Sequence, residues 1–125
     1  MREFHKMAIL VIVIVVILFG VFFVTRGEAE PNEYDEFAKC ITNSGAKMYG
    51  AYWCSHCKSQ KESFGDSWKL INYVECDPKG ENANPAECEE HGIKGYPTWI
   101  FGDGQRNAGS ISLSSLAIKT GCELP

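Results

Sequence analysis

The stretch AYWCSHCKSQ, residues 51–60, decides the fold of this chain. The residues from Lys47 to Trp53 predict a short strand, whose glycine and alanine indicate close packing against a neighbouring element. Ser55 to Phe64 predicts a helix. Cys54 and Cys57 therefore lie at a junction of strand and helix, one helical turn apart.

Two cysteines at such a junction indicate redox chemistry. The first sulfur lies near the positive end of the helix dipole, which favours the nucleophilic thiolate. The second is within reach for a disulfide, so Cys54 and Cys57 can exchange with thiols of another protein. His56 lies between them, where a positive charge or hydrogen bond would make the disulfide more oxidising; the alternative is a solvated histidine without redox effect.

A bare C-x-x-C also occurs as half of a zinc site or as a structural pair. The sequence contains no second C-x-x-C and no H-x-x-x-H, so we expect no metal site. We expect no bound cofactor either.

Outward from this segment, apolar spacing and turn residues predict the order α-β-α-β-α-β-β-α, a mixed α/β sheet covered on both faces. Asn32 is the predicted cap of the first helix, which has the apolar positions Tyr34, Phe37, Ala38 and Ile41 and stops at Gly45. The later elements are a strand over Leu70–Cys76, a helix over Pro85–His91, a hairpin of Thr98–Phe101 with Gln105–Ala108, and a helix over Ser112–Thr120.

The segments AYWCSHCKSQ and GIKGYPTWIFGDGQ (residues 92–105) resemble the active-site and cis-proline segments of the thioredoxin family, and the likeness covers residues 34–122. It implies a thioredoxin-like three-layer fold with a mixed sheet of about four strands. It also implies a cis Pro97 that faces the cysteines, with the Tyr96 backbone presented to a substrate strand. Trp53 would shield Cys54. An ordinary trans turn at Pro97 and a packing role for Trp53 are the alternatives.

The chain departs from the family pattern in two respects. Thioredoxins bury an acid six residues before the first cysteine, where this chain has Met48, so the activation of Cys57 should be slower. An early edge strand also has no counterpart, because residues 27–33 are few and polar.

KMYGAYWCSHCKSQKESFG (residues 47–65), INYVECDP (71–78) and GIKGYPTW (92–99) together resemble the thioredoxin-like domain associated with vitamin K epoxide reductase homologues. That family passes electrons from such a domain to a quinone. The resemblance implies an oxidase of protein thiols that is reoxidised at the membrane. Because this sequence has no second hydrophobic span, the reductase homologue is expected in a separate polypeptide.

The other four cysteines suit two structural disulfides in an oxidising compartment, and buried free thiols are the alternative. Cys76 and Cys88 flank a gap rich in Pro, Gly and Asn, which favours joining them. Cys40 and Cys122 then pair by elimination.

Met7–Val24 is a run of eighteen uncharged residues, long enough to cross a bilayer. It exceeds the apolar core of a signal peptide, which favours an uncleaved anchor over a cleaved signal. Arg2 and Lys6 before the run, against Arg26 after it, favour an N-terminus inside and a domain on the extracytoplasmic side of the cell membrane. The predicted organisation is a cytoplasmic stub and anchor (1–26), a tether (27–33) and a thioredoxin-like domain (34–125).

Beyond residue 26 the chain holds nine basic and fifteen acidic residues, a net charge of −6. Such acidity argues against nucleic-acid binding. The predicted function is a membrane-anchored thiol–disulfide oxidoreductase that oxidises secreted proteins. A reductase or isomerase and a disulfide-stapled interaction module remain the alternatives.

Overall fold

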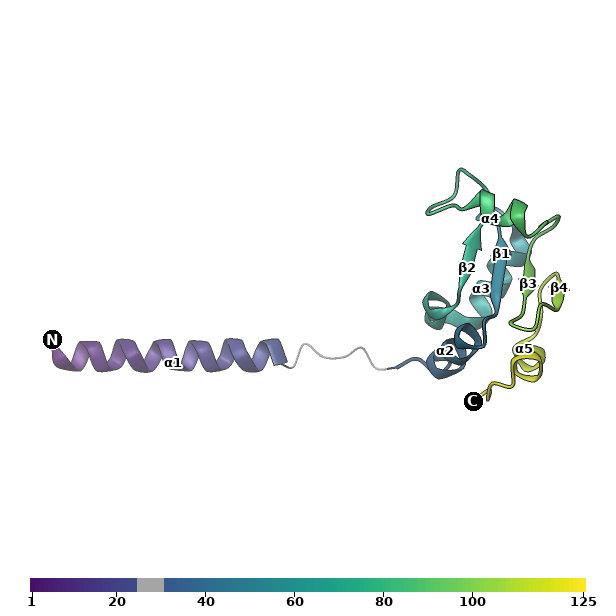
Figure 1. Cartoon of the computed structure of the whole chain (residues 1–125). Helices are drawn as coiled ribbons and strands as arrows, with labels where there is room; N and C mark the ends of the chain where they lie inside the picture. The colour runs from purple at the N-terminus through teal and green to yellow at the C-terminus, as the bar shows by residue number, and fades with distance from the viewer. Residues whose placement is uncertain (25–30) are drawn as a thin grey trace. The chain divides into compact units, whose positions relative to one another are not determined.

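The computed structural model describes residues 1–24 and 31–125 of the chain (Figure 1). Contacts divide the chain into two units, Met1–Glu30 and Pro31–Pro125. Arg26 and residues 27–30 of the predicted tether lie outside the described residues.

The first unit contains helix α1, Arg2–Val24. The predicted apolar run forms most of it, and the helix begins five residues earlier, where Lys6 and Glu3 form an exposed ion pair with an N–O distance of 3.1 Å. At 1.5 Å per residue its 23 residues span about 34 Å. None of them is buried, and α1 is long and apolar enough to cross a membrane. A signal sequence near an N-terminus has the same character.

The second unit is built on a four-stranded mixed sheet in the order β2-β1-β3-β4. The strands are β1 (Lys47–Gly50), β2 (Tyr73–Glu75), β3 (Thr98–Ile100) and β4 (Arg106–Ala108). β1 runs parallel to β2 and antiparallel to β3, which is antiparallel to β4. The predicted α/β class and the mixed sheet of four strands are confirmed.

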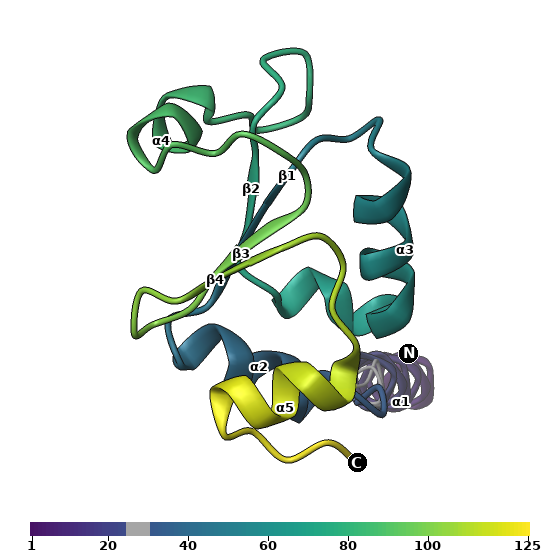
Figure 2. The ribbon, with the colours of Figure 1, turned by 90° about the vertical axis from the view of Figure 1, so that its right-hand side faces the viewer.

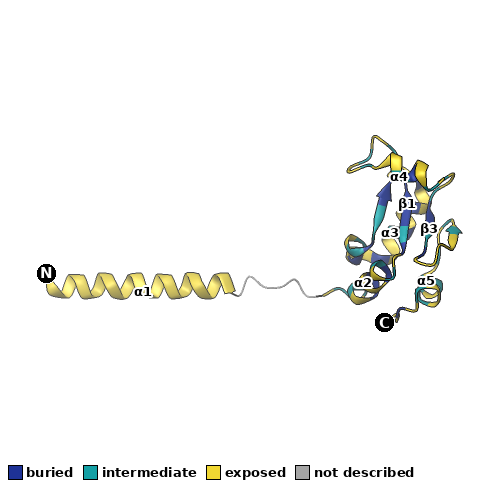
Figure 3. Ribbon diagram, in the orientation of Figure 1, coloured by how far each residue is buried: buried dark blue, intermediate teal, exposed yellow. Residues whose placement is uncertain are grey.

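Helices cover both faces of this sheet, and Figure 2 shows α3 and α4 on opposite sides of the strands. One face packs against α2 (Asp35–Asn43), α3 (Ser55–Phe64), the 3-10 helix η1 (Gly65–Leu70) and α5 (Leu113–Thr120). The other face packs against α4 (Pro85–Glu90) through Tyr49, Val74, Cys76 and Cys88. The dark strands in Figure 3 lie at the centre of these layers.

Three element predictions need correction. The first strand ends at Gly50 and not at Trp53, because the chain turns toward α3 with Cys54 N–H donating to Ala51 O at 3.0 Å. The strand predicted over Leu70–Cys76 is only Tyr73–Glu75, because η1 takes up Leu70.

The third correction concerns the start of α2. Tyr34 occupies its N-cap position and caps no backbone N–H with its side chain. Asn32 makes a different contact, in which its backbone N–H donates to the Asp35 carboxylate at 3.0 Å. The Asp35 carboxylate therefore holds the segment that leads into α2, and the Asn32 side chain is not the cap.

Candidate active site

Cys54 is the N-cap residue of α3. Its backbone is extended, with φ −74° and ψ 119°, and its Sγ accepts a hydrogen bond from the Cys57 backbone N–H at 3.2 Å. The free N–H groups and the dipole of a helix both favour negative charge at this position. The Cys54 sulfur is therefore held where a thiolate would be stabilised.

Cys57 lies one turn along α3, and both cysteines are free thiols in the structure. Cys54 is 7% exposed and Cys57 is 0% exposed, so Cys54 is the sulfur that an incoming group can reach. Burial, followed by the hydrogen bond with Cys54, raises the pKa of Cys57 to about 12. At neutral pH Cys57 is a protonated thiol beside the slightly exposed Cys54, an arrangement that suits an attacking and a resolving cysteine.

Two aromatic side chains border the Cys54 end of α3. Trp53 is 56% exposed, its Nε1–H donates to Asp77 Oδ2 at 2.8 Å, and its ring meets that of Tyr96 edge-on at 6.0 Å between centroids. The Lys79 backbone N–H and then the Trp53 indole hold the pKa of Asp77 below its usual value. Tyr96 precedes the buried Pro97, and the peptide bond between them is cis. The structure thus brings together Trp53 and Tyr96, two of the residues predicted to contact substrate.

His56 is exposed on the first turn of α3. Its backbone carbonyl accepts a hydrogen bond from Ser110 Oγ at 3.2 Å, which ties α3 to the loop before α5. Among the contacts of the described residues, none joins the imidazole ring to either sulfur.

The remaining four cysteines form two disulfides in the structure, joining the pairs expected from the sequence. Cys40 of α2 is bonded to Cys122, after α5, and Cys76 is bonded to Cys88 of α4. Both lie outside the C-x-x-C segment, so Cys54 and Cys57 are left as the free pair. In the part of the chain that the structure describes, no group of three His, Cys, Asp or Glu side chains is placed to hold a metal ion.

Sequence reasoning missed three residues around the cysteines. Gln60 is buried on α3, where its Oε1 accepts from the Ile111 backbone N–H at 2.8 Å and its Nε2 donates to the Ile111 carbonyl at 3.1 Å. Its place three residues after Cys57 and four before Phe64 puts it on the buried helix face, which could have revealed it. Tyr73 and Glu75 lie on β2, and no local pattern connects them to the cysteines.

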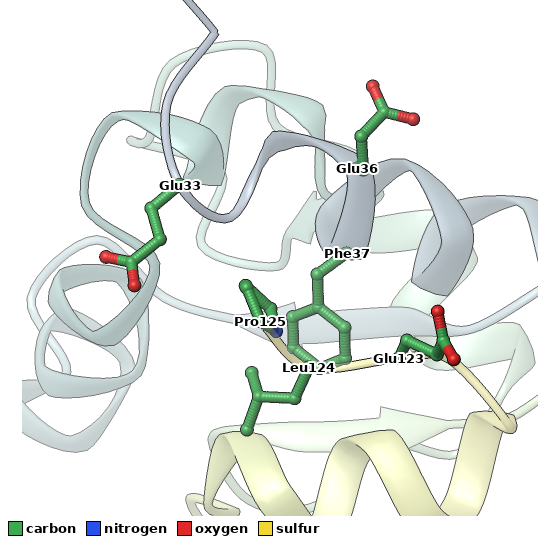
Figure 4. Close-up of a pocket in the computed structure, with 6 residues that line it drawn as sticks. All are labelled: Glu33, Glu36, Phe37, Glu123, Leu124 and Pro125. Atoms are coloured by element: carbon green, nitrogen blue, oxygen red, sulfur yellow. The ribbon is translucent and has the colours of Figure 1, made fainter.

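A hollow of about 660 Å³ lies elsewhere, between α2 and the C-terminal residues (Figure 4). It is lined by Glu33, Glu36, Phe37, Glu123, Leu124 and Pro125. Neither Cys54 nor Cys57 lines this hollow, so the candidate active site is the surface around Cys54.

Comparison with known proteins finds two informative relatives. Over 91 residues the chain is 47% identical to "Thiol-disulfide oxidoreductase LTO1" of Arabidopsis thaliana, covering 70% of this chain and 24% of that protein. Over 79 residues it is 33% identical to "Protein disulfide-isomerase-like protein EhSep2" of Emiliania huxleyi, covering 57% of this chain and 34% of that protein. The chain thus spans about a quarter and about a third of these curated relatives. No protein-family model matches it.

Proposed function

We propose that this chain, whose relatives and four-stranded α/β fold support a thioredoxin-like family, is a membrane-anchored thiol–disulfide oxidoreductase that oxidises thiols of secreted proteins. The observation that carries the proposal is the hydrogen bond at the start of α3. Cys54 Sγ accepts from the Cys57 N–H there, with the Cys57 sulfur one turn away and fully buried. This geometry supports Cys54 as the nucleophile and Cys57 as the resolving residue.

The oxidation of a substrate begins with a disulfide between Cys54 and Cys57. A substrate thiolate attacks Cys54 Sγ, the bond between the two cysteines breaks, and Cys57 leaves and takes up a proton. A second substrate thiol then attacks the mixed disulfide, and Cys54 leaves with the electron pair. The substrate loses two electrons, and the protein ends as the dithiol that the structure contains.

The exposed aromatic surface supports a role in substrate contact. Trp53 and Tyr96 meet edge-on beside Cys54, and the cis Pro97 follows. In this proposal they receive an extended segment of the substrate next to the reacting sulfur. A positive charge on the His56 imidazole would raise the redox potential of the pair, without a direct contact to the sulfurs.

The dithiol must be reoxidised for a second turnover. We assign this step to a quinone-linked membrane partner, such as a vitamin K epoxide reductase homologue in a separate polypeptide. The likeness of residues 47–65, 71–78 and 92–99 to the domain associated with those proteins supports the assignment. Residues 7–24 of α1 anchor the chain as a single pass, with the N-terminus inside and the domain on the extracytoplasmic side.

Trapping with Cys57→Ala tests the activity. Without the resolving thiol, Cys54 should accumulate mixed disulfides with thiol-containing proteins, visible as reducible bands of higher mass on non-reducing gels. Cys54→Ala is the matched control and should trap none. A Cys57→Ala variant that traps nothing would instead favour a disulfide-stapled interaction module.

A reductase or isomerase is the second candidate, favoured by the likeness to the protein disulfide-isomerase-like protein of Emiliania huxleyi. The redox potential of the Cys54–Cys57 pair separates the candidates when it is equilibrated against glutathione. A value of about −270 mV, typical of reducing thioredoxins, would support a reductase and overturn the proposal of an oxidase. A value of about −120 mV, that of a strong protein oxidant, would support the proposal of an oxidase.

The membrane anchor has its own test. After membrane preparation, the full chain should resist alkaline carbonate extraction, and its mature N-terminus should still contain residues 1–24. A mature protein that begins after residue 24 would show a cleaved signal and overturn the anchor.

A further inference from the structure

The sheet-facing side of Cys57 borders Gly50 and Tyr73. A methyl carbon built on Gly50 would lie 2.9 Å from Cys57 Sγ, 3.1 Å from Tyr73 Cε2 and 3.3 Å from Tyr73 Oη. The thiol and the phenol ring therefore both border the position that a side chain at Gly50 would occupy. Tyr73 reaches this point from β2, the strand paired with β1.

Behind the phenol lies a buried carboxylate. Tyr73 Oη donates a hydrogen bond to Glu75 Oε2 at 2.8 Å, and the Asp77 backbone N–H donates to Glu75 Oε1 at 2.9 Å. Glu75 is only 5% exposed, and Gly80 leaves room for its side chain, because a Cβ there would collide with Glu75 Cγ. A buried acid is uncommon unless its oxygens are bonded, and both oxygens are bonded here.

Among the groups that face Cys57, the path through Tyr73 leads to a carboxylate, that of Glu75. Of the ionisable groups facing Cys57, Cys54 and Lys61 come from α3 and Tyr73 comes from β2; Lys61 Nζ lies 3.8 Å above the Tyr73 ring. On β1, Gly50 borders the thiol and Met48 belongs to the same core cluster, and neither side chain is a proton acceptor.

Tyr73 cannot keep a proton taken from Cys57. Burial and then the bond to Glu75 raise the pKa of Tyr73, so it remains a neutral phenol at ordinary pH. A phenol can pass a proton on, however, by giving its own to Glu75 while it accepts one from the thiol. The hydrogen bond between Tyr73 Oη and Glu75 Oε2 has the direction that this transfer needs.

We propose that Glu75 is the proton acceptor for Cys57, acting through Tyr73 Oη, when Cys57 resolves a mixed disulfide at Cys54. This inference rests on the proposed function. Cys54 first attacks the disulfide of an oxidant, which releases one oxidant thiol. Cys57 then gives its proton to Tyr73 Oη, which gives its own to Glu75. The Cys57 sulfur attacks Cys54 Sγ, and the second oxidant thiolate leaves and is protonated. The protein loses two electrons and the oxidant disulfide gains them.

The test follows the two steps separately in the full chain in detergent micelles. With Cys54 and Cys57 reduced and the other disulfides intact, excess glutathione disulfide is added and samples are quenched with acid. Mass spectrometry counts the glutathione adduct and the internal disulfide. The rate of adduct formation measures the attack by Cys54, and the rate of adduct decay measures resolution by Cys57.

Glu75→Gln keeps an oxygen that can accept from Tyr73 and removes the proton acceptor. At pH 7 we expect resolution to slow about 100-fold while adduct formation keeps its wild-type rate. The gap should narrow as the pH rises, because hydroxide then takes the Cys57 proton in the variant. Tyr73→Phe should slow the same step with the same pH dependence, so the test does not depend on one variant folding.

Glu87→Gln is the matched control. Glu87 also accepts a hydrogen bond from a tyrosine, Tyr49 Oη at 3.2 Å, but on the face of the sheet that packs against α4. It should resolve the adduct at the wild-type rate. Resolution at the wild-type rate in both Glu75→Gln and Tyr73→Phe would overturn the inference, and so would a slowing that is equal at every pH. A wild-type chain that forms no adduct would instead overturn the proposed function, and the inference with it.

Discussion

At the residue scale, Gly50 determines how closely Cys57 approaches the sheet. Its missing side chain leaves the space in which the Cys57 sulfur and the Tyr73 ring meet. A packed interior does not tolerate an extra carbon without shifting its neighbours. Gly50 has no reactive group of its own, but it therefore determines how Cys57 and Tyr73 are placed.

Gly50→Ala should consequently destabilise the fold. The new Cβ would lie 2.9 Å from Cys57 Sγ and 3.1 Å from Tyr73 Cε2. We expect a loss of about 1–3 kcal/mol in the free energy of unfolding, measured by urea denaturation of the full chain in micelles. Gly95→Ala is the matched control, because a Cβ at Gly95 meets nothing within 4 Å. Equal stability of the two variants would contradict this account of Gly50.

A second prediction at this scale concerns the ionisation of Cys57. Burial first, and then the bond with Cys54, raise its pKa from 9.0 to about 12. The raised pKa means that the protonated thiol persists to higher pH. At pH 10 an ordinary thiol is about 90% ionised, whereas we expect Cys57 to be almost wholly protonated.

Thiolate absorbance at 240 nm measures this ionisation. Cys54→Ser leaves Cys57 as the free thiol, and Cys54→Ser combined with Cys57→Ser provides the blank. The difference between the two should stay near zero up to pH 10 and rise above it. Thiolate at pH 8 would show that burial does not control this group.

At the element scale, α3 is held to the rest of the domain along its buried side. Cys57, Gln60 and Phe64 follow each other at spacings of three and four on that side. Gln60 bonds both backbone groups of Ile111, and its Oε1 also accepts from Trp99 Nε1 at 3.4 Å. One polar side chain thus links the helix that carries the cysteines to β3 and to the segment before α5.

Gln60→Ala should loosen this helix. The buried Trp99 Nε1–H and the half-buried Ile111 backbone groups lose their partner, and an unsatisfied buried group costs about 1–3 kcal/mol. We expect a fall of that size in the free energy of unfolding. Ser59→Ala is the control on the same helix, because the exposed Ser59 hydroxyl donates back to the Ser55 carbonyl of its own helix, at 3.2 Å. A Gln60→Ala variant as stable as Ser59→Ala would refute the linking role.

At the scale of the whole molecule, two disulfides close loops of very different length. Cys40 and Cys122 are 82 residues apart and join α2 to the chain after α5, whereas Cys76 and Cys88 are 12 apart. The longer loop restricts the unfolded chain more. The loop-entropy relation gives about 4.5 kcal/mol for the first disulfide and about 3 kcal/mol for the second.

Replacing both cysteines of a pair with alanine should reveal that order. We expect the variant without Cys40 and Cys122 to lose more unfolding free energy than the variant without Cys76 and Cys88. Peptide mapping without reductant establishes the pairing first: a Cys76–Cys122 peptide or a free Cys40 would contradict it. Equal losses would indicate that residual structure in the unfolded chain, and not loop length, controls stability.

What the sequence by itself determined was mostly local. Apolar spacing predicted α2, because side chains three and four residues apart share a helix face. Short runs bounded by turn residues predicted the mixed sheet, and the long uncharged run predicted the apolar helix. The C-x-x-C spacing predicted two sulfurs within one turn for the same reason. Local signals were weaker at element ends. Asn32 resembles a helix cap, but its backbone N–H donates to Asp35 instead. Leu70 resembles a strand residue, but it belongs to η1.

Only the tertiary structure decided what lies behind Cys57. Tyr73 and Glu75 are remote from it in the sequence and reach it because β2 pairs with β1 in the register Met48–Tyr73 and Gly50–Glu75. A shift of one residue would turn both side chains to the opposite face. No propensity specifies that register. The packing of the whole sheet determines this register. The register in turn places the Glu75 carboxylate near the cysteine segment, which has no acid of its own.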